Sequence, residues 1–515
     1  MNKKKMNVLL IFTDQQRYDT IEALGNPIIK TPVLNKLVEN GISFNKAYTP
    51  CPVCVGARYS MLTGQLPHRT GCADNEPSVF RESLMQILSN HGYQTMGVGK
   101  MHFTLPDQTL PKKQSLDTFI GSTNIKEKWG FDKRATSECD ELDDYKTFIR
   151  DSGYGHVSEP SGERSEMYYI PQPSQLPANL TETAWVVNRS IDYLRNRDIE
   201  KPFFMMTSFQ APHPPFVAPF PWNKFYRGAD MPLPKKPDGY ENFLTLWNKY
   251  QNRYKYMDQG INNNHLRTMK AYYYASISFI DYNLGLLLNY LESEKLMDNT
   301  MILFASDHGE LLGDYNAFGK RCFLDSAARI PLLMRYPGCK KQISINTPVS
   351  LVDILPTVLE FTDIESQNDY SGESLFGVIK GNSKRDVVYG QFQRHGLASY
   401  MAINENYKYI YSAPDDKELL FNQRTDPEET RNIAGNSLYL KKTEEMRGKL
   451  IDFLKAEGYL DPIQDNGWKK YSKREIPQDP DSYLLFQDDG NIIPEIDGYK
   501  TDANSLKYFK NRWYE

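Results

Sequence analysis

Short, continuous runs of apolar residues recur along the chain, and several end in polar or charged side chains. Such runs are typical of strands buried on both faces of a parallel sheet. The segments between them have apolar residues at helical spacing. We therefore expect strands over residues 7–13, 93–98, 202–209, 300–306 and 330–336, and helices over residues 31–39, 57–62, 81–90, 180–197, 265–295 and 347–361. Strands that alternate with helices predict an α/β fold with a large, mostly parallel sheet flanked by helices.

The pattern changes after residue 384. Residues 400–403 and 407–411 alternate around Asn404-Glu405-Asn406, which predicts an antiparallel hairpin. We therefore expect a large α/β domain over residues 1–384 and a smaller C-terminal α+β domain with an antiparallel β-sheet over residues 385–515. Residues from 457 onward, with many Asp, Pro, Gly and Tyr, are interpreted as a wrapping tail of this second domain.

Two long segments, residues 105–180 and 216–262, have little clear periodicity and are rich in proline. Segments of this length inside a compact domain are usually functional. We expect residues 105–180 to form a long excursion over the active-site face that carries specificity, and residues 216–262 to form a second insertion, rich in proline and aromatic residues.

Composition narrows the classes of protein and partner. The chain has 515 residues, of which 40% are hydrophobic and 24% charged, as in an ordinary globular protein. A net charge of −4 gives no reason to expect nucleic acid or an anionic membrane as partner. The apolar run after Lys3-Lys4-Lys5 is too short for a signal-peptide core, and no run reaches the roughly 20 apolar residues of a membrane span. We expect a cytoplasmic protein.

The most unusual stretch of the sequence is residues 49–64, which contains Cys51 and Cys54 in a proline-bracketed turn followed by Gly56 and a predicted helix. A side chain at Cys54 would lie near a helix N-terminus, where a thiolate is stabilised. Arg58, four residues on, would share its face of the helix. The stretch taken alone is also consistent with a buried structural cysteine. Cys51-x-x-Cys54 matches half of a zinc-site pattern, but no second CxxC or CxxH follows at suitable spacing. It also matches a CxxC redox pair, but no thioredoxin-like βαβ context surrounds it.

Polar groups follow four predicted strands. These residues are Asp14 and Gln15, Lys100 and His102, His213, and Asp307 and His308. Each alone would most often be a helix cap or a hydrogen-bonded core residue. Because the carboxyl ends of parallel strands meet at one edge, where ligands bind, we expect these groups to converge. Oxygen donors with a histidine suit one divalent metal, Ca²⁺ first and Mn²⁺ or Mg²⁺ as alternatives, and we assign Asp14, Gln15, Cys54, Asp307 and His308 as ligands.

A series of motifs in a fixed order carries a family resemblance. In chain order they are Asn7-Val-Leu-Leu-Ile-Phe-Thr-Asp-Gln15, Cys54-Val-Gly-Ala-Arg58, Leu62-Thr-Gly64, His68-Arg-Thr-Gly71, Gly97-Val-Gly-Lys-Met-His102, Ala211-Pro-His213, Ser306-Asp-His-Gly309, Gly319-Lys320, Arg329-Ile-Pro331, Tyr336-Pro-Gly338, Tyr407-Lys-Tyr409, Asp426-Pro427 and Arg431-Asn432. The chain resembles the sulfatase family of the alkaline-phosphatase-like superfamily, near the arylsulfatase, choline-sulfatase and phosphonate monoester hydrolase types. The resemblance covers residues 7–435.

The resemblance implies a hydrolase of sulfate monoesters. In sulfatases the cysteine at the place of Cys54 is oxidised to formylglycine (3-oxoalanine), whose hydrated aldehyde is the nucleophile, and this implies a maturation enzyme as partner. Arg58 would activate that nucleophile and His102 would stabilise or deprotonate its hydroxyl. Lys100, His213 and Lys320 would hold the sulfate, with His213 or Lys320 protonating the leaving group. We expect a small-molecule or oligosaccharide sulfate ester as substrate, no nucleic acid or membrane partner, and possible homo-oligomers.

Two departures from the family pattern keep alternatives open. Gly56 stands where the family usually has proline or alanine, and Gln15 and His308 replace the more usual aspartate and asparagine. The Gln15 and His308 variants leave open a phosphonate monoester or phosphodiester hydrolase that uses the same site. A catalytically inactive binding homologue without formylglycine is the other alternative. The choice of a sulfated carbohydrate rests on family habit and on aromatic residues in the insertion, namely Trp222, Tyr226, Tyr240 and Trp247.

Overall fold

The computed structural model describes residues 6–76, 79, 81–103, 129–138, 143–164, 168–253, 260–339 and 341–476. Much of the predicted excursion over residues 105–180 and most of the predicted tail lie outside these residues. Among the described residues, no helix combines the length and the apolar character that a membrane crossing requires.

A single eight-stranded sheet forms the centre of the large domain, with strand order β12-β2-β11-β9-β1-β7-β4-β5. The strands are β1 (Asn7–Thr13), β2 (Ile42–Phe44), β4 (Gln94–Gly99), β5 (Lys133–Thr136), β7 (Phe203–Ser208), β9 (Thr300–Ser306), β11 (Leu332–Arg335) and β12 (Ile343–Ile345). Strand β1 is parallel to both neighbours, β7 and β9. Strand β11 alone runs antiparallel to its neighbours β9 and β2, so the predicted, mostly parallel sheet is confirmed.

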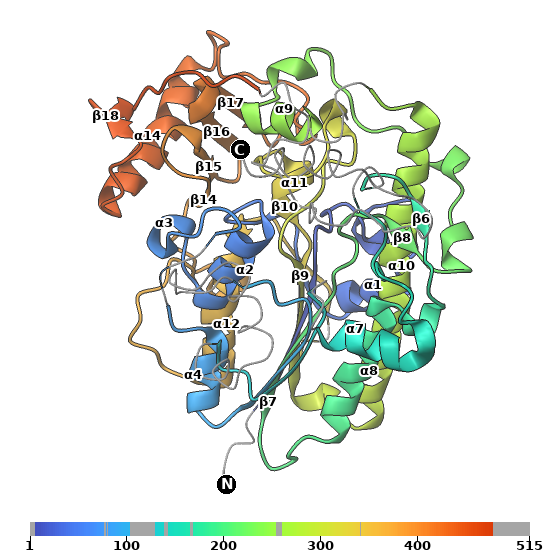
Figure 1. The fold of residues 1–515 in the computed structure, drawn as a ribbon. Coiled ribbons are helices and arrows are strands. Elements are labelled where there is room, and N and C mark those ends of the chain that lie inside the picture. Colours follow the sequence, from blue (N-terminus) through green and yellow to red (C-terminus); the bar gives the residue numbers. More distant parts are fainter. Residues whose placement is uncertain are drawn as a thin grey trace, which may run out of the picture.

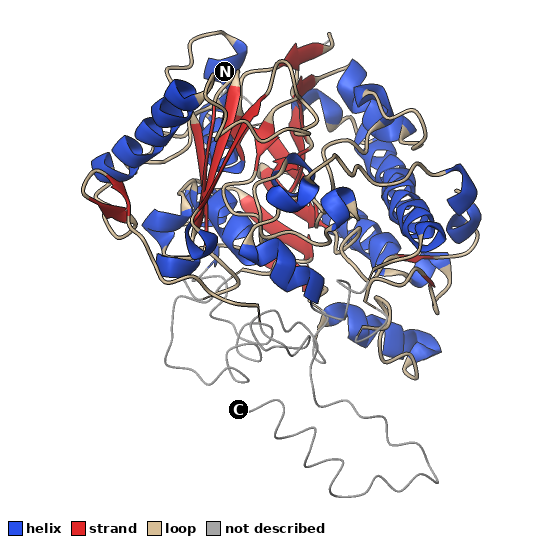
Figure 2. Cartoon of the chain, turned by 90° about the horizontal axis from the view of Figure 1, so that it is seen from above, coloured by secondary structure: helices blue, strands red, loops and turns tan. Residues whose placement is uncertain are grey.

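Helices cover both faces of this sheet (Figures 1 and 2). One face carries α2 (Cys54–Thr63), α4 (Leu84–Asn90) and α12 (Ile354–Thr362), and the other carries α1 (Pro32–Glu39), α8 (Glu182–Arg195) and α10 (Asn263–Ser293). Val8, Leu10 and Phe12 of β1 belong to the first core, whereas Leu9 and Ile11 belong to the second. Burial on both faces explains the unbroken apolar run, since each such side chain contributes roughly 1.5–3 kcal/mol when it leaves water.

The C-terminal region forms a second sheet, drawn in orange in Figure 1. Its strands β14 (Val388–Phe392), β15 (Ser399–Ile403), β16 (Tyr407–Ser412) and β17 (Lys417–Asn422) pair antiparallel in sequence order. Helix α14 (Leu440–Ala456) packs on β15 and β16. The predicted hairpin is confirmed, while the domain boundary between residues 384 and 385 stays a prediction.

Two predicted elements differ from the sequence pattern. The predicted strand over residues 330–336 is split into β10 (Arg329–Ile330) and β11. The break lies at Pro331, which lacks the N–H that pairing with a neighbouring strand requires. The predicted helix over residues 347–361 starts only at Ile354, since a capping box between Ser350 and Asp353 opens a short 3₁₀ turn first. The remaining elements are α3 (Pro67–Thr70), α7 (Asp144–Ile149), α9 (Leu246–Arg253), α11 (Asp325–Ala328), α13 (Leu375–Ile379), β3 (Ala47–Tyr48), β6 (Gln172–Pro173), β8 (Val217–Ala218), β13 (Val349–Ser350), β18 (Ile463–Gln464) and β19 (Gly467–Trp468).

A buried ion cluster joins the second sheet to the large domain. Lys408 of β16 has its Nζ 2.5 Å from Asp325 Oδ1 of α11 and also contacts the carboxylate of Glu429. The backbone N–H of Asp325 donates to Glu429 Oε2 at 2.7 Å, and the Tyr48 hydroxyl donates to Asp325 Oδ1 at 3.1 Å. All four side chains are buried, so each charge depends on the others for its compensation.

Substituting Lys408→Met should therefore leave Glu429 without this cation and leave Asp325 paired with Arg329, whose terminal nitrogen lies 3.2 Å from Asp325 Oδ2. We expect the free energy of unfolding to fall by about 3–5 kcal/mol, measured by denaturant titration. Lys470→Met is the matched control, because Lys470 pairs with Asp416 at the surface and its side chain is 68% exposed. Equal stability of the two variants would contradict a joining role for the cluster.

Candidate active site

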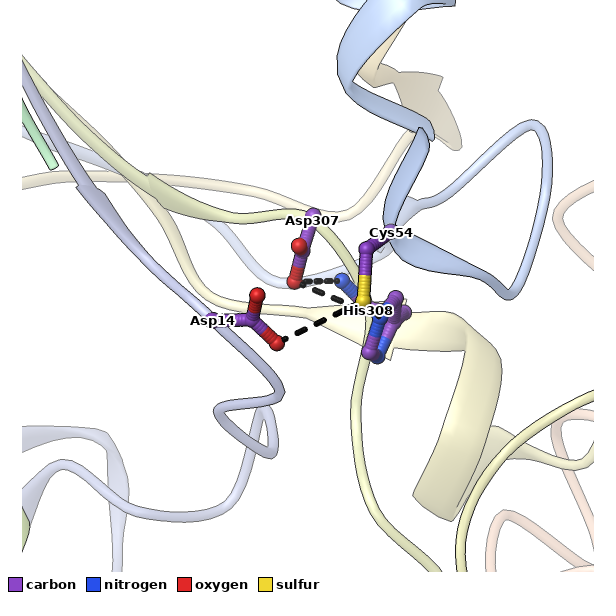
Figure 3. A group of neighbouring side chains, drawn as sticks. All are labelled: Asp14, Cys54, Asp307 and His308. Atoms are coloured by element: carbon purple, nitrogen blue, oxygen red, sulfur yellow. Dashed lines mark hydrogen bonds and ion pairs between the residues drawn. The ribbon is translucent and has the colours of Figure 1, made fainter. Parts of the chain in front are cut away.

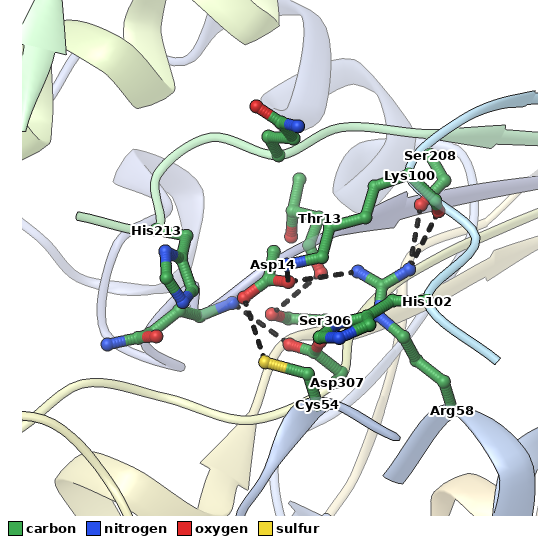
Figure 4. A network of polar contacts seen from close by, with 12 residues as sticks. Thr13, Asp14, Cys54, Arg58, Lys100, His102, Ser208, His213, Ser306 and Asp307 are labelled. Carbon is green, nitrogen blue, oxygen red and sulfur yellow. Dashed lines mark hydrogen bonds and ion pairs between the residues drawn. The ribbon is translucent and has the colours of Figure 1, made fainter. Parts of the chain in front are cut away.

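The four polar strand ends meet at one edge of the sheet. Strands β9, β1, β7 and β4 are consecutive and parallel, so their carboxyl ends lie side by side. Asp14 and Gln15 follow β1, Lys100 and His102 follow β4, His213 follows β7, and Asp307 and His308 follow β9. The structure brings all of these predicted residues to the same place, together with Cys54, Arg58 and Lys320. Figure 4 labels Asp14, Cys54, Arg58, Lys100, His102, His213 and Asp307 of this group.

Cys54 is the first residue of α2 and is 2% exposed. Its sulfur lies 2.9 Å from Lys320 Nζ, 3.3 Å from His308 Nε2 and 3.8 Å from Asp14 Oδ1 (Figures 3 and 4). The position at the helix start directs the side chain toward the strand ends, as the sequence pattern predicted. The thiol thus occupies the centre of the polar cluster.

The electrostatic environment stabilises a negative charge on Cys54. Burial alone would raise the pKa of the thiol, but the positive charges of Lys320 and Lys100, with His308, lower it well below its ordinary value. A thiolate or another anionic oxygen or sulfur at this position is therefore favoured, which is the property a nucleophile site needs.

Arg58 fixes the two carboxylates in place. Its Nε donates to Asp307 Oδ2 at 2.9 Å, and one terminal nitrogen lies 3.4 Å from Asp14 Oδ2. The other terminal nitrogen donates to the Lys100 carbonyl at 2.9 Å and to Ser208 Oγ at 3.0 Å (Figure 4). The guanidinium is fully buried under the site, so it holds both strand ends and compensates their charge.

Two lysines supply further positive charge. Lys100 Nζ lies 2.6 Å from Asp14 Oδ2, and Lys320 Nζ donates to Gln15 Oε1 at 2.8 Å as well as to Cys54. Burial and the charge of Cys54 raise the pKa of Asp14, but Lys100, His213 and Lys320 outweigh them and hold it well below its usual range. Asp14 is therefore ionised at neutral pH.

The two histidines differ in environment. His213 shares a 2.6 Å hydrogen bond with the Pro214 carbonyl through Nδ1, and burial together with the charge of Lys320 lowers its pKa to about 3. His102 has a positive φ of 46°, and the backbone N–H groups of Met101 and His102 both donate to Glu138 Oε1, at 2.6 Å and 2.9 Å. The Nδ1 atom of His102 is buried without a hydrogen-bond partner among the described residues, which leaves it available to a ligand.

The donor set fits a divalent cation. One ligand atom each from Asp14, Cys54, Asp307 and His308 lie within 4.8 Å of one another, and all four residues are buried (Figure 3). Burial and the nearby charge of Asp14 raise the pKa of Asp307, so the two carboxylates destabilise each other's ionised form. A cation between them would relieve this repulsion, and carboxylate, amide and imidazole donors suit Ca²⁺, Mg²⁺ or Mn²⁺.

Sequence reasoning did not single out three residues that hold the site together. Glu310 is buried, contacts the Gln15 amide through Oε2, and accepts from the Leu312 N–H at 2.9 Å through Oε1. It thereby directs the Gln15 oxygen toward Lys320. Ser208 supports Arg58, and Glu138 supports the backbone at His102. A glutamate directly after Asp307-His308-Gly309 was the one available signal, whereas the partners of Ser208 and Glu138 are distant in sequence.

Gly56 is explained by packing against Cys51. A Cβ atom added at Gly56 would lie 2.6 Å from Cys51 Sγ and 3.1 Å from the Cys72 carbonyl oxygen. Cys51 itself is buried, lies outside the group around Cys54 and donates its S–H toward the Ala73 carbonyl at 3.4 Å. The Cys51-x-x-Cys54 spacing therefore reflects core packing behind α2, and the zinc and redox readings find no support in this geometry.

Gly56→Ala should destabilise the protein although alanine favours helices. The helix gains about 0.5–1 kcal/mol from alanine, but overpacking against Cys51 costs about 1–3 kcal/mol. Adding Cys51→Ala should recover most of the loss, as measured by denaturant unfolding of the single and double variants. Gly448→Ala in α14 is the control, since no atom lies within 4 Å of its added Cβ. If Gly56→Ala were as stable as Gly448→Ala, the packing explanation would be wrong.

Comparison with known proteins agrees with the motif order. The sulfatase family profile matches residues 6–364, and a profile described as N-sulphoglucosamine sulphohydrolase, C-terminal, matches residues 313–456. An arylsulfatase of Clostridium perfringens is 32% identical over 475 residues, which span 89% of this chain and 96% of that protein.

More distant relatives include a choline-sulfatase of Rhizobium meliloti, 28% identical over 465 residues, 85% of this chain and 84% of that protein. An N-acetylglucosamine-6-O-sulfatase of Bacteroides thetaiotaomicron is 26% identical over 535 residues, 89% of this chain and 88% of that protein. The fold matches a crystal structure of phosphonate monoester hydrolase of Agrobacterium radiobacter with a TM-score of 0.75 and 23% identity, over 91% of this chain and 100% of that chain. The chain therefore belongs to the sulfatase family, whose members are sulfuric ester hydrolases with an alkaline-phosphatase-like fold.

Proposed function

We propose that this protein hydrolyses sulfate monoesters of carbohydrates with a formylglycine derived from Cys54 and one divalent metal. The observation that carries the proposal is the position of Cys54, at a helix start, between two buried carboxylates and two lysines. Asp14, Gln15, Asp307 and His308 would hold the metal, with Ca²⁺ favoured by the oxygen-rich donor set. The bound metal would supply positive charge that polarises a sulfate oxygen and lowers the pKa of a coordinated hydroxyl.

Formylglycine would supply a hydrated aldehyde hydroxyl as nucleophile at the place now occupied by the Cys54 sulfur. The surrounding residues are arranged for this role. Arg58 holds Asp14 and Asp307 from below, and Lys320 points at the nucleophile position from 2.9 Å. His102, whose side chain hydrogen-bonds to Cys54 and whose Nδ1 has no partner within the described part of the chain, is the group placed to accept a proton from a hydroxyl there.

Sulfate binding and leaving-group protonation fall to Lys100, His213 and Lys320. The positive charges of Lys100 and Lys320, beside His213, would stabilise the charge that develops on the sulfate oxygens. Burial, with the charge of Lys320, lowers the pKa of His213 to about 3, so its ring is neutral near pH 7. The one ring proton of the neutral form lies on Nδ1, which donates to the Pro214 carbonyl. Lys320, as an ammonium group with three N–H donors, is the better proton donor for the departing alcohol.

The carbohydrate part of the proposal rests on relatives more than on aromatic residues. The relative from Bacteroides thetaiotaomicron is named an N-acetylglucosamine-6-O-sulfatase. The profile that matches the C-terminal region is described as that of an N-sulphoglucosamine sulphohydrolase. Trp247, expected to contact sugar, is 3% exposed and donates its indole N–H to the Leu397 carbonyl. Trp222 packs on Phe279 and Tyr282, so neither tryptophan supports sugar binding.

Hydrolysis of phosphonate monoesters or phosphodiesters is the second candidate. The Gln15 and His308 variants and the fold match to a phosphonate monoester hydrolase favour it. The ratio of kcat/KM on 4-nitrophenyl sulfate to that on an aryl phosphonate monoester discriminates the two candidates. A ratio above one supports the sulfatase proposal.

Formylglycine formation has a direct signature in mass. The peptide that contains Cys54 should be lighter by about 18 Da than its sequence mass when the protein is made with its maturation enzyme. Cys54→Ala should keep the far-UV spectrum and the unfolding midpoint of the parent while losing turnover by at least about three orders of magnitude. Turnover of substrate by protein whose Cys54 is unmodified would contradict the proposed mechanism. An unmodified protein without activity would support the alternative of an inactive binding homologue.

Metal content tests the ligand assignment. Asp307→Asn removes a buried anionic donor, so we expect metal affinity to fall roughly 10–100-fold, measured by elemental analysis after equilibrium dialysis. Asp369→Asn serves as control, because the Asp369 side chain is 85% exposed and pairs with Arg69 at the surface. Unchanged metal stoichiometry in Asp307→Asn would count against this site.

A further inference from the structure

Arg321 lies next to the proposed nucleophile but has not been given a role. It follows Lys320 directly, and its backbone N–H donates to the Pro52 carbonyl at 3.1 Å, two residues before Cys54. Its φ of 68° lies in the left-handed region, which non-glycine residues seldom adopt. The segment that presents Lys320 to the site therefore fixes Arg321 beside the turn that carries Cys54.

The Arg321 side chain is a buried cation without a compensating anion. It is 5% exposed, and its side-chain contact is one hydrogen bond from a terminal nitrogen to Gln251 Oε1 at 3.3 Å. Its Nε has no partner, and no carboxylate pairs with it among the residues that the structure describes. Burying an uncompensated guanidinium is costly, so such a group usually has a ligand to meet.

Two other buried arginines show the contrast. Arg17 pairs with Asp19 and Asp314, and Arg58 pairs with Asp14 and Asp307. The fold thus provides carboxylates where a guanidinium serves the structure. Arg321 has an amide in their place.

The surroundings of Arg321 connect it to the site. Gln251 is held in position, since its amide Nε2 donates to the Tyr169 hydroxyl at 3.2 Å and packs against Gly319. The neighbouring Tyr168 ring lies 6.2 Å from the ring of His213 and carries the Arg164 guanidinium over its face at 6.0 Å. A series of contacts therefore leads from Arg321 through Gln251 and the Tyr169–Tyr168 pair to His213, with Arg164 over the Tyr168 ring.

We propose that Arg321 binds a second anionic group, a sulfate or a carboxylate, on the same substrate molecule, so that the preferred substrate is a carbohydrate sulfate with at least two negative groups. A planar guanidinium with free N–H donors suits either oxyanion. The guanidinium groups of Arg321 and Arg164 disfavour a substrate such as choline sulfate, whose alcohol carries a quaternary ammonium. The inference rests on the proposed sulfate-ester site, which it extends by one subsite.

Binding to full-length Cys54→Ala protein tests the subsite without turnover. Titration calorimetry would compare glucosamine 2-N,6-O-disulfate, glucuronate 2-sulfate and, as a monosulfate without a free amine, N-acetylglucosamine 6-sulfate. We expect the two dianions to bind roughly 10–100-fold more tightly than the monosulfate. Preference for the disulfate alone identifies a second sulfate, and preference for the uronate alone identifies a carboxylate. Equal affinity for all three ligands, or no binding, overturns the proposal.

Adding Arg321→Gln to the Cys54→Ala protein should abolish the preference for dianions and change the affinity for the monosulfate by no more than about threefold. Adding Arg321→Lys, which keeps the positive charge, should retain part of the preference for dianions. Arg195→Gln, at the surface of α8, is the matched control and should change nothing. A dianion preference that survives Arg321→Gln overturns the proposal. Turnover of 4-nitrophenyl sulfate by the unsubstituted protein is measured separately. If the hydrolase proposal is wrong, this turnover is absent, whereas an error in the Arg321 proposal changes only the ratios of the binding affinities.

Discussion

The balance of buried charge at the end of strands β1 and β9 constrains the rest of the structure. Asp14 and Asp307 are fully buried, and both would be destabilised if Arg58 did not bridge them from α2. Lys100 and Lys320 add charge above the carboxylates. Because each group compensates another, none of the elements that carry them has freedom to shift without exposing an unpaired charge. The nucleophile position is thereby held within hydrogen-bond reach of its neighbours.

The second sheet takes part in this arrangement. Lys408 of β16 pairs with Asp325 at the start of α11, and the segment between β9 and α11 carries Lys320 and Arg321. The C-terminal region therefore anchors the segment between β9 and α11, which carries the Lys320 ammonium group that contacts Cys54. Within the described residues, the contribution of this region to the site is positional, since the groups that meet at Cys54 all come from the first 320 residues.

Most of the site was predictable because its residues follow signals that are local in sequence. Apolar runs that end in Asp14-Gln15 or Asp307-His308 indicate strand ends, and parallel strands place such ends at one edge. The residues that sequence missed act through long-range contacts. Ser208 meets Arg58, and Glu138 meets the backbone of His102, across separations that no periodicity records. Trp247 illustrates the opposite error, since an aromatic side chain in an irregular segment proved to be core.

The sequence by itself determined the α/β alternation, the antiparallel hairpin and the set of residues at the strand ends, because hydrophobic periodicity and strand termini depend on neighbours in the chain. Tertiary structure alone decided which charges compensate which. Gly56 is needed because Cys51 Sγ occupies the adjacent space, and Arg321 stands out because Gln251, not a carboxylate, meets it. Both facts depend on contacts between segments whose spacing in the chain gives no indication of their distance in space.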